Sequence, residues 1–204
     1  NPLAIAMEGV GYLSRKIKTE DENINKTLQY IKDSIKRADN IIINLLHVAR
    51  ITELDSELCD LNYIIQNSIN EHTPLFEKHG IKIVQSLYQT LPETKLDIEK
   101  IKQILTNIFI NAVAAMSEGG SISISTSHAN SNILVDIKDN GAGIAEEILN
   151  KIYDPFFTTK SHTGGTGLGL WITKQMVELH GGIITIENNP DKGATVKLRF
   201  PAVS

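Results

Sequence analysis

The chain has 204 residues, of which 41% are hydrophobic and 22% charged, and it carries a net charge of −4. This balance is typical of a globular protein with one or two domains and enough apolar residues for a core. It gives no sign of the concentrated basic face that nucleic acid would require, so we expect no nucleic-acid partner. The single cysteine, Cys59, excludes an internal disulfide and a cysteine-based metal site.

No apolar run reaches the roughly 20 residues of a membrane span, and no signal peptide is visible. We therefore expect no membrane contact by this chain and a cytoplasmic location. The sequence begins Asn1-Pro2-Leu3 without an initiator methionine, which indicates a fragment. The parent protein could still be membrane-anchored.

Residues 1–54 are predicted to form an antiparallel helical hairpin. Asn1 and Pro2 suit the cap and first position of one helix, and the polar residues 18–23 predict the turn. The second helix has apolar residues in alternating steps of four and three, which is a heptad pattern: Ile24, Leu28, Ile31, Ile35, Ala38, Ile42, Leu45 and Ala49. Two helices alone leave this seam exposed, so we expect a homodimer through the hairpin, as a four-helix bundle.

Residues 55–204 are predicted to form a second domain of class α+β. Periodicity predicts helices over residues 61–78, 98–116 and 168–180, and strands over 81–84, 121–127, 133–137, 183–187 and 195–200. Helices and mostly antiparallel strands segregate along the chain. We therefore expect a two-layer α/β sandwich with a mostly antiparallel sheet.

Nine of the 14 glycines lie between Gly141 and Gly193. The first glycine motif, Asp139-Asn140-Gly141-Ala142-Gly143-Ile144, directly follows a predicted strand. Its glycines would let the backbone approach a flat ligand, and its carboxylate could accept hydrogen bonds from an amino group. A plain Asn-Gly turn is the alternative. A dinucleotide fingerprint is excluded because Glu146 stands in place of the third glycine.

The second motif, Gly164-Gly165-Thr166-Gly167-Leu168-Gly169-Leu170, opens a predicted helix. Free amides at a helix N-terminus bind anions, so the motif favours a phosphate ligand over a plain flexible loop. The third motif is Gln103, Asn107 and Asn111, which share one face of a very apolar helix. Amide oxygens suit Mg²⁺. The alternative is an amide network that ties the helix to the sheet.

In this order, the motifs resemble the ATP-binding catalytic domain of two-component sensor histidine kinases, within the superfamily that includes gyrase, the Hsp90 chaperones and the MutL proteins. The resemblance covers residues from about 55 to 201. Residues 107–112, 139–143, 154–160 and 165–170 resemble the N, G1, F and G2 boxes. His180-Gly181-Gly182 and Gly193-Ala194-Thr195 match the elements that follow.

The resemblance implies ATP and Mg²⁺ as cofactors and gives the site residues roles. Asp139 would bind the adenine amino group, with Gly143 and Thr195 beside the base. Asn111 would hold Mg²⁺, Asn107 would contact the phosphates, and residues 158–166 would form a mobile lid. The expected catalytic residues are Asn107, Asn111 and Lys160, although Lys160 could equally be a solvated lysine. The expected nucleotide-binding residues are Asn107, Asn111, Asp139, Gly141, Gly143, Ile144, Phe157, Thr158, Thr159, Lys160, Gly165, Thr166, Gly167, Leu168, Gly169 and Thr195.

The hairpin in turn resembles a dimerisation and phosphotransfer domain, in which His-Glu-x-x-Asn-Pro-Leu carries the phosphoacceptor. This chain begins at the Asn-Pro-Leu, so the acceptor histidine would lie just before residue 1. The function implied is transfer of the γ-phosphoryl group of ATP to that histidine, and from there to an aspartate of a response-regulator receiver domain. A departure from many relatives is Ala114, which stands where they have a basic residue.

Two other functions remain open, an ATP-driven conformational clamp and a non-catalytic nucleotide-binding scaffold. The clamps of the superfamily place a Glu four residues before the metal-binding Asn, where it activates water. This chain has Asn107 at that position. A neutral amide is a poor general base, so the sequence favours transfer over hydrolysis.

Overall fold

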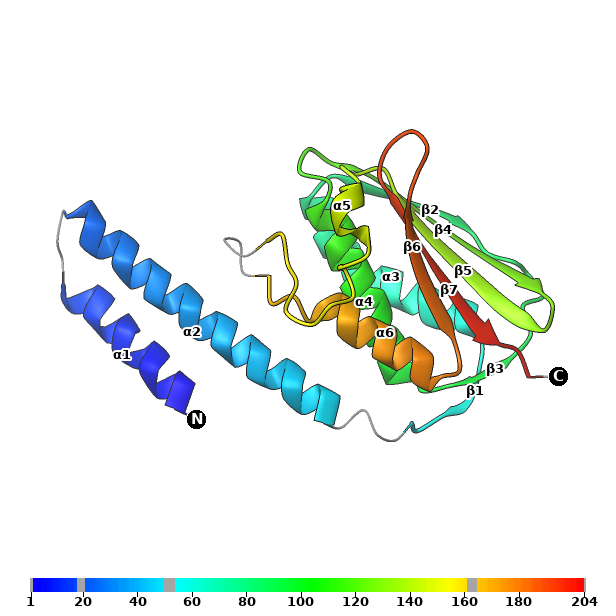
Figure 1. Cartoon of the computed structure of the whole chain (residues 1–204), viewed down its shortest axis with the longest axis horizontal. Coiled ribbons are helices and arrows are strands. Elements are labelled where there is room, and N and C mark those ends of the chain that lie inside the picture. Colours follow the sequence, from blue (N-terminus) through cyan, green and yellow to red (C-terminus); the bar gives the residue numbers. More distant parts are fainter. Residues whose placement is uncertain (1, 18–20, 50–53, 161–164, 204) are drawn as a thin grey trace. The chain divides into compact units, whose positions relative to one another are not determined.

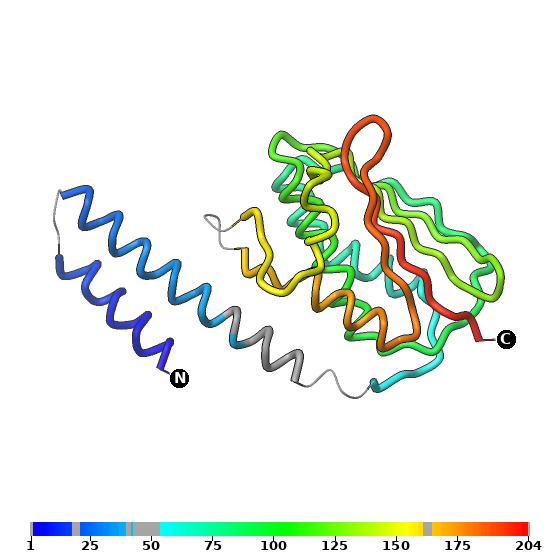
Figure 2. Tube along the Cα trace, in the orientation of Figure 1, coloured from blue at the N-terminus to red at the C-terminus, as the bar shows by residue number. Residues whose placement is uncertain are grey.

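The computed structural model describes residues 2–17, 21–49, 54–160 and 165–203, apart from the side chains of residues 40, 41 and 43–49 (Figure 2). The chain forms two compact units. One comprises residues 1–52 and 154–168, and the other comprises residues 53–153 and 169–204. The domain boundary after residue 54 stays a prediction.

The predicted hairpin is present as α1 (Pro2–Lys16) and α2 (Glu22–Ala49), which pack against each other. The carboxylate of Asp21 accepts a hydrogen bond from the amide of Asn23 (2.8 Å), which caps the start of α2. The predicted cap Asn1 and the middle of the predicted turn lie outside the described residues. So do the side chains of Leu45 and Ala49, at the end of the heptad pattern.

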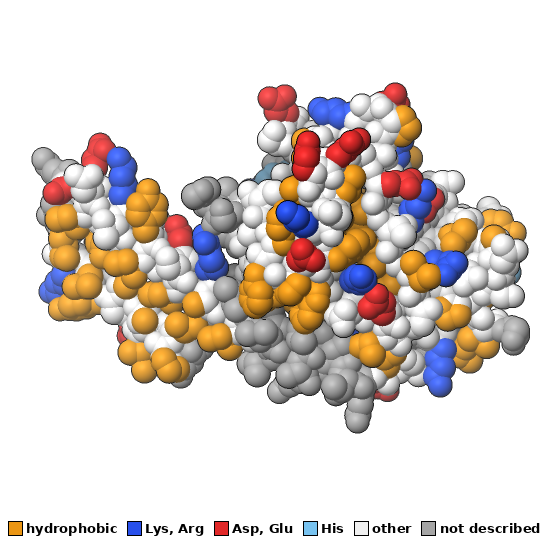
Figure 3. Space-filling model, viewed as in Figure 1, with side chains coloured by type: hydrophobic (Ala, Val, Ile, Leu, Met, Phe, Trp, Pro, Cys, Tyr) orange, Lys and Arg blue, Asp and Glu red, His pale blue; other side chains and the backbone are white. Residues whose placement is uncertain are grey.

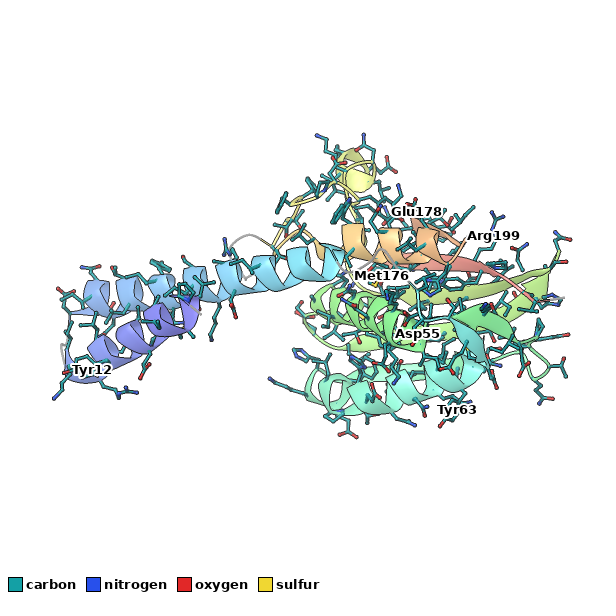
Figure 4. The ribbon with its side chains drawn as sticks, turned by 90° about the horizontal axis from the view of Figure 1, so that it is seen from below. Tyr12, Asp55, Tyr63, Met176, Glu178 and Arg199 are labelled. Carbon is teal, nitrogen blue, oxygen red and sulfur yellow. The ribbon has the colours of Figure 1, made fainter. Side chains whose placement is uncertain are left out.

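Hydrophobic side chains gather on the surface of the hairpin (Figure 3). Tyr12, labelled on α1 in Figure 4, is 54% exposed, and Ile31 of the heptad pattern is 41% exposed. Among the hairpin side chains that the structure describes, the other large exposed apolar ones are Ile5, Leu13, Ile17, Ile24, Tyr30 and Ile42. Across the described part of the chain, no helix is both long enough and apolar enough to span a membrane.

The second unit is built on a five-stranded sheet with the order β2-β4-β5-β7-β6. The strands are β2 (Ile81–Ser86), β4 (Gly120–Ala129), β5 (Asn132–Asp139), β6 (Ile183–Asn188) and β7 (Ala194–Pro201). The β2–β4 pair is parallel and the other three pairs are antiparallel. The predicted mostly antiparallel sheet is therefore confirmed.

Three helices form the second layer, on one face of this sheet (Figure 1). They are α3 (Leu61–Lys78), α4 (Ile98–Ala114) and α6 (Gly169–Leu179), and a short helix α5 (Glu146–Leu149) follows the first glycine motif. Apolar residues of β4 and β5 alternate with polar ones, so every second side chain is buried under the helices. The predicted two-layer α+β architecture is confirmed.

A small second sheet pairs β1 (Glu57–Cys59) with β3 (Thr94–Leu96), which the sequence did not predict. Just before β1, the amide of Asp55 donates a hydrogen bond to Asp97 Oδ2 (3.1 Å), and Asp55 is labelled in Figure 4. Asp97 is the residue that caps α4. Residues 55–59 are thus fastened to the base of that helix.

Candidate functional site

Helix α4 carries the asparagine pair of the candidate site. The carboxylate of Asp97 caps the helix by accepting a hydrogen bond from the amide of Lys100 (3.1 Å). Packing of the apolar face outweighs the poor helix propensity of asparagine. That buried face consists of Ile101, Ile104, Leu105, Ile108, Phe109, Ala112 and Val113. Asn107 and Asn111 lie at its margin and are both half-buried.

The amide of Asn111 is available to a ligand. Its side chain makes no hydrogen bond to any residue that the structure describes. Asn111 is half-buried, so its amide remains accessible to solvent and to a ligand. An amide oxygen of this kind suits Mg²⁺.

The side-chain amide of Asn107 is held by hydrogen bonds from its nitrogen to α6. Its Nδ2 donates to Thr173 Oγ1 (3.2 Å) and, over a longer distance, to the carbonyl oxygen of Gly169 (3.4 Å). Both acceptors lie in the first turns of α6. The predicted contact of Asn107 with phosphates would need its NH₂ group as donor, because phosphate oxygens only accept. In this structure that group donates to α6, and the phosphate contact stays a prediction.

Asp139 ends β5 and is the most buried acid of the site, with 8% of its surface exposed. Its Oδ1 accepts hydrogen bonds from the amides of Gly141 (2.8 Å) and Ala194 (3.3 Å). Within residues 54–160 and 165–203, no hydrogen bond reaches Oδ2. The carboxylate is therefore oriented by the protein through one oxygen and can accept from a ligand amino group through the other.

Glycines allow the chain to close tightly around Asp139. A side chain on Gly141 would place its Cβ 2.8 Å from the carbonyl oxygen of Ala115 and 2.9 Å from Asp139 Oδ1. Gly193 has a φ of +89°, and a Cβ there would overlap the main chain of Asp139. Only glycine fits these two positions without a shift of the backbone.

The register of β5 and β7 places Thr195 relative to Asp139, and its expected place beside the base stays a prediction. Lys138 of β5 pairs with Thr195 of β7, so the next residue of β5, Asp139, comes opposite Ala194, whose amide donates a hydrogen bond to Asp139 Oδ1 (3.3 Å). Side chains alternate between faces, so Thr195 lies on the opposite face from the carboxylate. Its hydroxyl donates to Asn189 Oδ1. The structure thus places Ala194, and not Thr195, beside Asp139.

Two asparagines that the sequence analysis missed hold the loops of the site. Asn188 Oδ1 accepts from the amide of Ile144 (2.8 Å), and its Nδ2 donates to the carbonyl oxygen of Ile144 (2.6 Å). Asn189 Nδ2 donates to the carbonyl oxygens of Asp139 (2.8 Å) and Lys192 (3.1 Å). Consecutive asparagines before Pro190 read as an ordinary turn, so the sequence gave no sign of either role.

A buried histidine ties α6 to α4. His180 Nε2 accepts from the amide of Asp97 (3.0 Å), and its Nδ1 donates to the carbonyl oxygen of Met176 (2.7 Å), which is labelled on α6 in Figure 4. Both contacts together require the neutral imidazole. Burial lowers the pKa of His180 below its ordinary value, which favours that neutral form.

Residues 154–168 belong to the other unit, and they are held by hydrogen bonds and close contacts among themselves. The amide of Lys160 donates to Thr158 Oγ1 (3.0 Å), and the amide of Gly165 donates to the carbonyl oxygen of Lys160 (3.0 Å). A Cβ on Gly165 would lie 2.6 Å from Thr158 Oγ1. Gly167 has a φ of +70°, and a Cβ there would overlap the main chain of Phe156. A side chain at Gly165 or Gly167 would therefore clash with residues 154–168 as they are folded here.

Burial lowers the pKa of the Lys160 ammonium. Residues 161–164, in the middle of the predicted lid, lie outside the described residues. The lid therefore stays a prediction, as do the expected nucleotide contacts of Lys160 and its neighbours: Phe157, Thr158, Thr159, Gly165, Thr166, Gly167 and Leu168.

The residues present in the second unit fit an adenine nucleotide with magnesium. Asp139 Oδ2 offers an acceptor beside Gly141 and Gly193, and the amide of Asn111 offers an oxygen to a cation. The first turn of α6, which begins at Gly169, offers helix N-terminal amides to an anion.

The comparisons with known proteins agree with this geometry. Residues 96–204 match the family described as histidine kinase-, DNA gyrase B- and HSP90-like ATPase. The chain is 30% identical over 201 residues to the sensor histidine kinase ZraS of Escherichia coli (strain K12), which covers 98% of this chain and 43% of ZraS. The chain thus spans less than half the length of this relative.

Similar solved structures include the catalytic domain of the histidine kinase ThkA, with a TM-score of 0.67 and 31% identity over 73% of this chain and 97% of that one. Full-length ShkA in complex with AMPPNP has a TM-score of 0.76 at 22% identity, over 100% of this chain and 43% of ShkA. ThkA in complex with the response regulator protein TrrA has a TM-score of 0.75 at 24% identity, over 99% and 59%. At these identities, the ShkA structure and the ThkA–TrrA complex show only that this chain shares their fold.

The family match covers more than half of the chain and includes the site from Asn107 to Ala194. The chain therefore belongs to the histidine kinase-, DNA gyrase B- and HSP90-like ATPases, and its resemblance to the ATP-binding catalytic region of a sensor histidine kinase is confirmed.

Proposed function

We propose that this chain positions Mg²⁺ and ATP for transfer of the γ-phosphoryl group to a histidine, and from there to the aspartate of a response-regulator receiver domain. The observation that carries the proposal is the pair of half-buried amides, Asn107 and Asn111, on one face of α4. The open amide of Asn111 suits a magnesium ion that bridges phosphates. The proposal places the chain in the cytoplasm, where ATP is available.

The same pair argues against a water-activating clamp. A general base for hydrolysis must accept a proton from water, which a carboxylate does and an amide does not. Asn107 stands where an acidic base would be needed. Phosphoryl transfer depends mainly on positioning and charge neutralisation, which such a site can supply without a base of its own.

Each residue then has a part in holding the nucleotide. Asp139 Oδ2 would accept from the adenine amino group while the amides of Gly141 and Ala194 keep the carboxylate in place. The N-terminal amides of α6 would face the phosphates. Bound Mg²⁺ would neutralise part of the phosphate charge, with Asn111 holding it.

The exposed apolar residues of the hairpin support a homodimer as part of this function. Ile24, Ile31 and Ile42 follow the heptad pattern and remain 39–48% exposed in the single chain. A second hairpin would bury them in a four-helix bundle. A response-regulator partner is supported by the solved complex of ThkA with TrrA, whose ThkA chain shares this fold.

The test uses γ-labelled ATP, Mg²⁺ and three proteins. They are the chain itself, the chain extended before Asn1 by a segment with an acceptor histidine and its adjacent acid, and the extended chain with Asn111→Ala. We expect acid-labile label on the extended chain, and much less on the chain itself and on the Asn111→Ala variant. An extended chain that binds ATP but takes up no label would favour a nucleotide-binding scaffold.

A further inference from the structure

The contact between Asn107 and Thr173 fixes which end of the asparagine amide is left for a ligand. Thr173 is fully buried, and its hydroxyl donates to the carbonyl oxygen of Gly169 (2.8 Å), one turn earlier in α6. The hydroxyl proton is thereby used. Thr173 Oγ1 can then only accept, and the donor that it accepts from is Asn107 Nδ2 (3.2 Å).

The orientation of the amide follows from this arrangement. Thr173 Oγ1 and the carbonyl oxygen of Gly169 (3.4 Å) both act as acceptors toward the end of Asn107 that faces α6. An amide turned over would place Oδ1 against these two oxygens, with no proton between them. Oδ1 is therefore the end that remains for a ligand, and in the part of the chain described it accepts no hydrogen bond.

We propose that Thr173 is a positioning residue that holds the oxygen of Asn107 ready for the magnesium ion or one of its bound waters. This deepens the proposed function and rests on it. A magnesium ion takes oxygen ligands, and its bound waters donate hydrogen bonds. Outer partners that orient a ligating side chain typically matter for metal affinity, because they set which atom faces the metal.

Thr173→Val is the central variant, since valine keeps the shape of threonine and removes the acceptor. Thr173→Ser keeps the hydroxyl. Thr106→Val is the matched control, because Thr106 is half-buried on α4 and makes no hydrogen bond to any described residue. Thr173→Ala removes the acceptor without a branched methyl and is measured alongside, so that misfolding of one variant does not decide the outcome.

The readout is the affinity for ADP, measured by calorimetry with Mg²⁺ and with EDTA. We expect Thr173→Val to reduce the magnesium-dependent gain in affinity about three- to tenfold, the range of one lost hydrogen bond. Affinity in EDTA should stay unchanged. Thr173→Ser and Thr106→Val should match the wild type, and the melting temperature of each variant shows whether it is folded.

A double-mutant cycle with Asn107→Ala separates positioning from general packing. If Thr173 acts through Asn107, Thr173→Val should reduce the magnesium-dependent gain no further in the Asn107→Ala background. A full magnesium-dependent gain in folded Thr173→Val, or an equal loss in both backgrounds, would overturn the inference. Failure of the wild type to bind ADP would instead overturn the proposed function.

Discussion

The side-chain amide of Asn188 pairs with both main-chain polar groups of Ile144, donating to the carbonyl oxygen (2.6 Å) and accepting from the amide (2.8 Å). The end of β6 thereby holds the glycine loop that follows β5. This loop leads out from Asp139, which we expect to bind the adenine amino group, so the loop lies beside the expected position of the adenine ring.

We expect Asn188→Ala to weaken ADP binding about three- to tenfold, because both hydrogen bonds are lost and the loop is released. The ADP affinity of Asn188→Asp should lie between those of the wild type and Asn188→Ala, since a carboxylate accepts from the amide of Ile144 but cannot donate to its carbonyl oxygen. Calorimetry measures the affinities. Asn150→Ala, at an exposed asparagine without a described side-chain hydrogen bond, is the control. Equal affinities for all four proteins would remove Asn188 from the site.

Asp139→Asn should weaken ADP binding about tenfold or more, because a charged acceptor for the adenine amino group is lost. Asp136→Asn is the matched control, since Asp136 lies on the same strand with its side chain on the other face of the sheet. Competition with IDP, which has a carbonyl in place of the amino group of ADP, provides a second measurement. Wild-type preference for ADP over IDP in Asp139→Asn would place the base elsewhere.

The register of the sheet explains why the sequence alone did not predict that Ala194 lies beside Asp139. The alternation of apolar and polar residues predicted strand β7, but it does not set the register of its pairing with β5. A shift of one position in that register would move every side chain to the other face of the sheet. Asp139 pairs with Ala194 only because β5 and β7 meet at Lys138–Thr195. Long-range pairing of this kind is not encoded in the local pattern of either strand.

Other parts of the fold were predictable because they rest on long local patterns. Helix α4 combines a capping acid at Asp97 with a continuous apolar face, and both signals are visible in the sequence. By contrast, β1 and β3 are three residues each, too short for a periodic signal. The role of Asn188 depends on a contact with Ile144, 44 residues earlier, which no local pattern contains.

The stability of the chain should fall as the pH drops below about 6.5 in part because of His180. Burial lowers the pKa of this residue in the folded state, so the unfolded chain takes up its proton first. The contribution is fully present above the unfolded pKa and is lost as the pH falls toward the folded one. Urea unfolding at several pH values measures the slope.

The variant His180→Gln should show a smaller loss of stability between pH 7 and pH 5, because glutamine does not titrate. His128→Gln is the control, since His128 is exposed at the end of β4. A slope in His180→Gln as steep as that of the wild type would assign the pH dependence to other groups.

Ile31→Lys should weaken the proposed dimer about tenfold or more, because burial of an isoleucine is lost and a charge is placed in the seam. Gln29→Lys adds the same charge on a polar part of α2 and should leave the dimer intact. Sedimentation at several concentrations gives the dissociation constants. A wild-type chain that stays monomeric at high concentration would contradict the prediction.

The attachment of residues 55–59 to β3 and Asp97 has a mechanical consequence. A force applied to the chain at Asp55 acts directly on the first turn of α4, because Asp55 is hydrogen-bonded to Asp97 and β1 is paired with β3. Asn107 lies ten residues further along this helix, about 15 Å away at 1.5 Å per residue. Helix α4 thus joins, as one continuous element, the attachment point of residues 55–59 and the side chains that we expect to meet the metal.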